Sequence, residues 1–127
     1  MEKIRLLEQF LKKEPGLELA VLIGSRSNST NRTDSDWDIA IRWDRALDFI
    51  TKLGRSEALR CKLANQMKLG EQSIDLIDMA DAGLSMRAEI AENGILLVGD
   101  NTLAWSRFLQ RVWRELEEFY WDEIYAT

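Results

Sequence analysis

The sequence predicts a single α/β domain. Short segments that are continuously apolar or that alternate apolar and polar residues, as strands do, alternate along the chain with segments whose apolar residues recur at helical spacing. The 127 residues leave room for one hydrophobic core, and no low-complexity tract, repeat or linker divides them. We therefore expect residues 1–127 to form one domain.

The N-terminal half predicts a helix followed by two strands. Apolar residues at helical spacing begin at Ile4, and the pattern stops at Pro15-Gly16. Residues 17–23 (LELAVLI) are a continuous apolar run, which is typical of a buried strand. Residues 36–43 (DWDIAIRW) alternate, which predicts a strand with its tryptophans and isoleucines toward the core. The opposite, working face of that strand carries Asp36, Asp38, Ala40 and Arg42.

The C-terminal half continues the alternation of helices and strands. Residues 44–69 are predicted to be helical, with a break near Gly54 and a restart at Ser56 as an N-cap. A strand is predicted at 73–79 and a helix at 81–93. A strand or extended edge segment is predicted at 94–100, and a final helix at 101–127.

Composition excludes several kinds of chemistry. The chain has no histidine and one cysteine, so catalysis by a Ser-His-Asp triad, histidine-ligated metals and an internal disulfide are ruled out. A net charge of −5 argues against direct nucleic-acid binding and against binding to an anionic membrane. The charged N-terminal segment is unlike a signal peptide and no segment is long and apolar enough to span a bilayer, so a cytoplasmic location is expected.

The segment GSRSNSTNRTDSDWD (24–38) carries the candidate site. Asp36 and Asp38 are two residues apart on a predicted strand, so their carboxylates share a face and repel each other. Arg42 is the one nearby cation that could neutralise them, and a hard divalent cation such as Mg²⁺ would do so too. Asp75, on another predicted strand, could supply a third carboxylate if the two strands are neighbours.

The Gly24-Ser25 step suits a phosphate. It follows a buried strand directly, so the glycine would let the backbone approach a phosphate group closely, and the Ser25 hydroxyl would add a donor. Together with a metal held by carboxylates, this predicts a site for Mg²⁺ and a nucleoside triphosphate. A plainer interpretation is that residues 34–36 are turn residues and that the carboxylates are solvated. The site for Mg²⁺ and a triphosphate is favoured because a strand, a Gly-Ser step, a fixed gap and a D-x-D motif follow one another in this order.

The pattern GS-x10-DxD, filled by Gly24, Ser25, Asp36 and Asp38, resembles the signature of minimal nucleotidyltransferases of the DNA polymerase β superfamily. Short chains of this kind are similar to MNT antitoxins, of the MntA type, in HEPN–MNT toxin–antitoxin modules. The resemblance implies a polymerase beta-like nucleotidyltransferase domain, with a mixed sheet flanked by helices. It departs from many relatives at Ser29, where they have a second glycine.

The resemblance also implies a mechanism and a partner. Asp36, Asp38 and Asp75 would be the catalytic, Mg²⁺-binding carboxylates, and Gly24, Ser25 and Arg26 would hold the triphosphate of ATP, the co-substrate. Such antitoxins transfer AMP from ATP to a tyrosine of a HEPN ribonuclease toxin, with which they form a hetero-oligomeric complex, and so inactivate it. Arg26 could equally be a solvated residue at a helix start.

Residues 101–127 are predicted to be a helix that also contacts the partner. The stripe of apolar residues from Trp105 to Leu116 predicts packing on the domain core. The aromatic residues between Phe119 and Tyr125 cover more than one helical face, which favours an interaction surface. Two other functions stay open: nucleotidyl transfer to a small molecule or an RNA end, and a non-catalytic antitoxin that acts by stoichiometric binding.

Overall fold

The computed structural model describes residues 2–24 and 37–125. Its elements, in chain order, are α1 (Glu2–Lys12), β1 (Leu17–Ile23), β2 (Trp37–Trp43), α2 (Phe49–Gln66), the short 3-10 helix η2 (Glu71–Ser73), β3 (Ile74–Asp78), α3 (Leu84–Asn93), β4 (Ile95–Val98) and α4 (Leu103–Tyr125). This order of helices and strands is the one that the hydrophobic pattern predicts.

The four strands form one mixed sheet in the order β3-β2-β1-β4. β1 lies between β2 and β4 and is antiparallel to both, whereas β2 and β3 are parallel. Because β1 is central, its apolar run is buried on both sides, as a continuous hydrophobic strand predicts. β3 is an edge strand. The predicted mixed sheet flanked by helices is confirmed.

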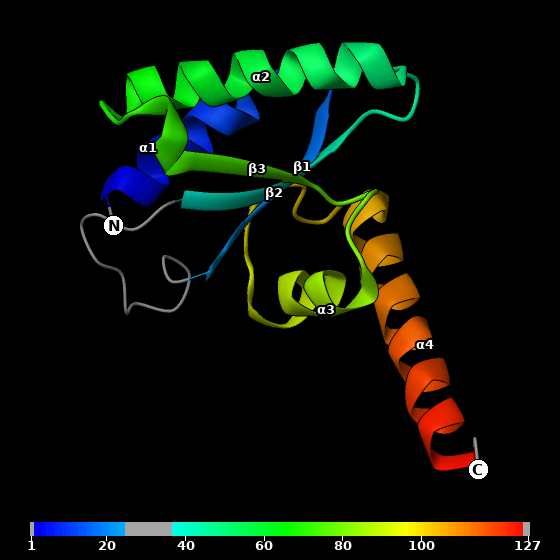
Figure 1. Ribbon diagram of the computed structural model, residues 1–127. Coiled ribbons are helices and arrows are strands. Elements are labelled where there is room, and N and C mark those ends of the chain that lie inside the picture. The colour runs from blue at the N-terminus through cyan, green and yellow to red at the C-terminus, as the bar shows by residue number, and fades with distance from the viewer. Residues whose placement is uncertain (1, 25–36, 126–127) are drawn as a thin grey trace.

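Helices cover both faces of the sheet (Figure 1). On one face, leucines of α1 and α2 pack against alternate residues of β1 and β2, including Leu22, Ile39 and Ile41. On the other face, Ile90 of α3 and Phe108 and Val112 of α4 pack against the remaining residues of the same strands. The sheet is therefore the middle layer of three.

α2 is one continuous helix, so the predicted break near Gly54 is wrong. The helix begins after Asp48, whose Oδ1 accepts a hydrogen bond from the Thr51 N–H at 2.7 Å. Hydrogen bonding to the Thr51 side chain, with a further contribution from this backbone bond, lowers the pKa of Asp48. Gly54 costs the helix about 1 kcal/mol. Burial of Leu59 and Leu63, each 0% exposed, outweighs that cost. Ser56 lies inside the helix, where its Oγ accepts a hydrogen bond from Trp43 Nε1 at 2.9 Å.

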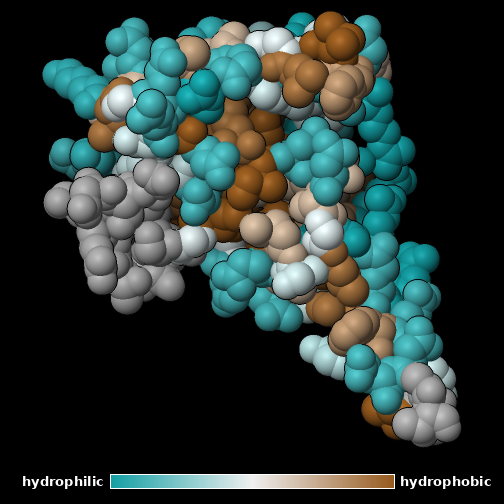
Figure 2. All heavy atoms as spheres, in the orientation of Figure 1, coloured by the Kyte–Doolittle hydropathy of each residue, from teal (hydrophilic) through white to brown (hydrophobic). Residues whose placement is uncertain are grey.

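The two halves of α4 have different surroundings. Phe108 and Val112 are buried, and Trp105 stacks on Phe108 with ring centroids 5.4 Å apart. Trp113, which the stripe predicts to be packed, is 45% exposed. Beyond Leu116 the helix projects away from the sheet, and hydrophobic residues stand among hydrophilic ones along its end (Figures 1 and 2). In the described part of the chain, no helix is both long and apolar enough to cross a membrane.

Candidate active site

Asp38 lies at the start of β2, between two neighbouring strands. It is in register with Ile23 of β1 on one side and with Asp75 of β3 on the other. Asp38 is half-buried, and the next residue on its side of the strand, Ala40, is fully buried beneath α3 and α4. Asp38 therefore stands where the covered face of the sheet opens to solvent.

Gly24 follows β1 directly and lies against Asp38. Its φ of +80° belongs to the left-handed region that favours glycine, and a Cβ at this position would stand 2.9 Å from Asp38 Oδ2. A larger residue would therefore be strained and would displace the carboxylate. The glycine of the Gly-Ser step thus allows a close approach to the carboxylate of the D-x-D motif.

Asp75 stands beside Asp38 on the parallel strand β3. Cα atoms of register partners on adjacent strands are about 4.8 Å apart, and their side chains leave the sheet on the same side. Ile77, two residues after Asp75, packs with the core on the α3–α4 face, which is also the face of Asp38. Asp75 is exposed at the edge of the sheet. The condition for a third carboxylate, that the two strands are neighbours, is met.

Three predicted site residues, Ser25, Arg26 and Asp36, lie outside the described residues. The described residues contain no group of three histidine, cysteine, aspartate or glutamate side chains that could hold a metal ion. The two described carboxylates supply oxygen donors, which Mg²⁺ prefers, and Mg²⁺ typically takes one or two carboxylates together with substrate phosphates. Asp38 and Asp75 therefore fit such an ion.

Arg42 does not lie beside Asp38. It is in register with Leu19, four residues along β2 from Asp38, a separation of roughly 13 Å. Arg42 borders a cavity at the opposite end of the strand together with Arg45. The working face of β2 is also not exposed to solvent along its whole length, because Ala40, which lies between Asp38 and Arg42, is 0% exposed. Alternation identifies two faces of a strand but does not show that helices cover both.

A hollow beside Asp75 is a feature that the sequence reasoning missed. It has a volume of about 450 Å³ and lies between α2 and the edge strand β3. Phe49 and Leu53 of α2 line it and are 64% and 51% exposed. Apolar residues at 49, 50 and 53, on one face at the start of a predicted helix, were the available signal. A hydroxyl-bearing acceptor entering this hollow would come close to Asp75.

The thiol of Cys61 does not take part in this site. It lies on α2, where a hydrogen bond to Glu71 raises its pKa, and burial adds to the effect. A raised pKa leaves less of the nucleophilic thiolate. The chemistry of the described site therefore comes from carboxylates.

The comparisons with known proteins agree with this arrangement. Residues 5–103 match the family model described as "Polymerase beta, Nucleotidyltransferase". The comparison with functionally curated proteins gave no match.

Several solved structures have a similar fold. A crystal structure of a toxin–antitoxin with AMP-PNP is 27% identical, with a TM-score of 0.66 over 93% of this chain and 87% of that chain. A mutant of the toxin–antitoxin MntA–HpeT is 26% identical, with a TM-score of 0.64 over 93% and 85%. The Shewanella oneidensis complex of a tri-AMPylated HEPN toxin with its MNT antitoxin is 23% identical, with a TM-score of 0.64 over 93% and 87%.

The family match spans most of the chain and includes the Gly24, Asp38 and Asp75 positions. The fold that places these residues together is the fold of those structures, and this agrees with the similarity of the motif to MNT antitoxins. The chain belongs to the polymerase beta nucleotidyltransferase family.

Proposed function

We propose that this protein is an antitoxin that transfers AMP from ATP, in a Mg²⁺-dependent reaction, to a tyrosine of a HEPN ribonuclease toxin in the cytoplasm. The observation that carries the proposal is the register of Asp38 with Asp75, with Gly24 packed against Asp38, in a chain of the nucleotidyltransferase family. This arrangement supports metal-dependent attack on a nucleoside triphosphate.

Each site residue has a distinct part in the proposed reaction. Asp36, Asp38 and Asp75 would hold the metal, which when bound offsets the negative charge of the triphosphate. Gly24 leaves space beside the Asp38 carboxylate that a Cβ would fill. Ser25 and Arg26 would donate hydrogen bonds to the phosphate chain. These contacts would hold the triphosphate beside Asp38 and Asp75.

Asp75 would act on the acceptor. It is exposed beside the hollow between α2 and β3, where a tyrosine side chain can approach. As the tyrosine oxygen bonds to the α-phosphorus, the bond between the α- and β-phosphates breaks and pyrophosphate leaves. The Asp75 carboxylate would favour loss of the tyrosine proton.

The outer half of α4 would hold the toxin in a hetero-oligomeric complex. Tyr120, Trp121 and Ile124 are 60%, 61% and 67% exposed. Aromatic residues of this kind dominate the energetics of protein interfaces. The likeness to a toxin–antitoxin structure that contains AMP-PNP supports both a protein partner and ATP as co-substrate.

Label transfer tests the proposal. The purified protein is incubated with a HEPN-family toxin, Mg²⁺ and ATP labelled at the α-phosphate, and peptide mass spectrometry locates the label. We expect AMP on a toxin tyrosine and none when Mg²⁺ is chelated. A complex that forms and silences the toxin without label would instead indicate a stoichiometric antitoxin. Label found only on a small molecule or an RNA end would also overturn the proposal.

A further inference from the structure

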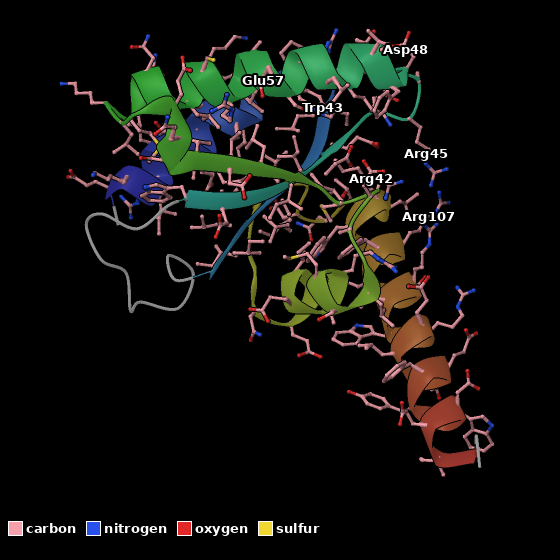
Figure 3. The ribbon with its side chains drawn as sticks, in the orientation of Figure 1. Arg42, Trp43, Arg45, Asp48, Glu57 and Arg107 are labelled. Carbon is pink, nitrogen blue, oxygen red and sulfur yellow. The ribbon has the colours of Figure 1, made fainter. Side chains whose placement is uncertain are left out.

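A basic cavity lies at the end of β2 opposite to Asp38. Its volume is about 530 Å³. Five cationic side chains line it, and they come from β2, the turn after β2, α2, α3 and α4: Arg42, Arg45, Lys52, Arg87 and Arg111. Figure 3 shows Arg42 and Arg45 extending to the same side of the molecule, with Arg107 of α4 nearby in the view. Four separate segments of the fold and a turn thus bring positive charge to one hollow.

The acidic residues of the cavity do not balance these cations. Only Asp78 and Glu115 contribute carboxylates. Glu115 forms an ion pair with Arg87, and Asp78 Oδ1 accepts a hydrogen bond from the Ala80 N–H at 2.9 Å. Within the described ranges, the other four cations have no ion-pair partner at 4.0 Å or less. The imbalance is notable because the whole chain carries 22 acidic and 17 basic residues.

The walls of the cavity rest on buried residues. Trp43, Met79 and Phe108 also line it, and they are 2%, 2% and 6% exposed. Trp43 is fixed further by the hydrogen bond of its Nε1 to Ser56 Oγ at 2.9 Å. The cationic residues therefore belong to segments that pack on buried residues, and this packing fixes the separations of the Cα atoms of the cationic residues.

The cavity does not include the residues proposed to hold the metal and the phosphates, although Lys52 and Asp78 line both this cavity and the hollow beside Asp75. Neither Gly24, Asp38 nor Asp75 lines it. Ala40, which stands between Asp38 and Arg42 on the same side of β2, is 0% exposed and covered by the α3–α4 core. A ligand held by Arg42 thus cannot lie along the strand to reach Asp38 across this face.

The charge and the residue types indicate the ligand. A carboxylate brings a single negative charge, whereas a chain of two or three phosphates brings several in a compact volume. Arginine, which supplies four of the five cations, binds phosphate oxygens through paired, parallel hydrogen bonds. We propose that this cavity binds a compact polyphosphate group, free or carried by a nucleotide, without a metal ion. The proposal does not depend on AMP transfer.

Titration calorimetry at low salt, with EDTA present, tests the proposal. The protein carries Asp38→Asn and Asp75→Asn, so the carboxylate site cannot contribute a metal-held complex. We expect tripolyphosphate to bind, and Arg42→Gln with Arg45→Gln to weaken binding at least tenfold. The matched control is Arg5→Gln with Lys13→Gln, two exposed cations of the N-terminal segment, which should change the affinity less than twofold. Affinity should also fall steeply as salt is raised.

Two further arms complete the test. Lys52→Gln with Arg111→Gln, on other elements, should give the same loss if the first pair fails to fold. ATP that binds as tightly as tripolyphosphate indicates that the phosphate chain alone is recognised, ATP that binds more tightly indicates a nucleotide, and adenosine should not bind in either case. No binding at low salt, equal losses in the control variant, or binding that needs Mg²⁺ would each overturn the proposal.

Discussion

The Asp38 end of β2 and the outer half of α4 are positioned in opposite ways. Asp38 has a strand on each side, in register with Ile23 and Asp75, and a glycine packed against its carboxylate. Residues 117–125 of α4 extend beyond α3, and Phe119 and Trp121 are 49% and 61% exposed. One region has its side chains fixed by the fold, and the other offers apolar side chains that the fold leaves in water.

This difference indicates how catalysis and partner recognition would be divided between the two regions. A reacting group needs a fixed position, since small displacements are costly to catalysis. An interface needs apolar surface that becomes buried only when the partner arrives. If the two regions carry catalysis and recognition respectively, each can be damaged while the other still works. The predictions below test that independence, from the largest expected effect to the smallest.

Asp38→Asn should remove AMP transfer and leave capture of the toxin unchanged. Loss of one carboxylate from a Mg²⁺ site costs several kcal/mol of transition-state stabilisation, which lowers the rate at least about a hundredfold. Transfer of α-phosphate label measures the rate, and co-purification measures capture. Asp100→Asn, which removes an exposed carboxylate in the turn between β4 and α4 that lines neither cavity described above, is the matched control and should keep full activity. Normal transfer by Asp38→Asn would refute the metal assignment.

Truncation after Leu116 should have the converse effect. It removes Phe119, Tyr120, Trp121 and Ile124, and aromatic anchors of an interface contribute about 2 kcal/mol or more each. The shortened protein should stay folded and bind ATP, but neither capture nor modify the toxin. Circular dichroism, calorimetry and co-purification measure the three properties. An unfolded product, or one that modifies the toxin at the full rate, would show that this part of α4 is not a separate recognition region.

Both regions could be found in the sequence, but to different extents. Helical spacing and the apolar 17–23 run predict the elements, and the D-x-D after a Gly-Ser step indicates a candidate site, because these signals are local. The register of Asp38 with Asp75 is not local: 36 residues and α2 lie between them, and only the parallel pairing of β2 with β3 joins them. From the sequence, Asp75 could be proposed as a third carboxylate only on the condition that its strand is a neighbour of β2.

The remaining errors have the same origin. Gly54 was expected to break a helix by its own propensity, but burial of Leu59 and Leu63 on the sheet decides the outcome. Ala40 was expected on an open face, but α3 and α4, which follow more than 40 residues later, cover it. The cations Arg42, Arg45 and Arg111 are far apart in the sequence and meet only in the folded chain. Long-range packing, which a local pattern does not contain, decides each of these positions.

Substitution of two phenylalanines of α4 compares how much the inner and outer halves of this helix contribute to stability. Phe108 is 6% exposed and stacks on Trp105, whereas Phe119 is 49% exposed. Phe108→Ala should lower the free energy of unfolding by about 3–5 kcal/mol, because it leaves a cavity in the core. Phe119→Ala should change it by less than about 0.5 kcal/mol. Urea denaturation measures both, and similar losses at the two positions would mean that the outer half is also part of the core.

Gly24→Ala tests how tightly the Asp38 end is fixed. The new Cβ would stand 2.9 Å from Asp38 Oδ2, and alanine is unfavourable at a φ of +80°. Strain of this kind costs about 1–3 kcal/mol. We expect a lower denaturation midpoint together with slower AMP transfer, while toxin capture through α4 is retained. Gly70→Ala, where a Cβ meets nothing within 4 Å, is the control. Unchanged stability and transfer in Gly24→Ala would show that the close approach has no role.

The smallest effect is expected at Ser25, the next residue along the chain, which lies outside the described residues. If its hydroxyl donates to the triphosphate, Ser25→Ala should weaken ATP binding by roughly 1 kcal/mol or somewhat more, as for a hydrogen bond to a charged group. Calorimetry with Mg²⁺ present measures the loss, and EDTA should reduce the affinity at the carboxylate site far more than the substitution does. The Arg42→Gln, Arg45→Gln background lowers the contribution of the basic cavity at least tenfold. ATP binding in that background that is equally tight with and without Mg²⁺ would contradict a site assembled from carboxylates and the Gly-Ser step, and would leave recognition by α4 as the only function proposed for these two regions.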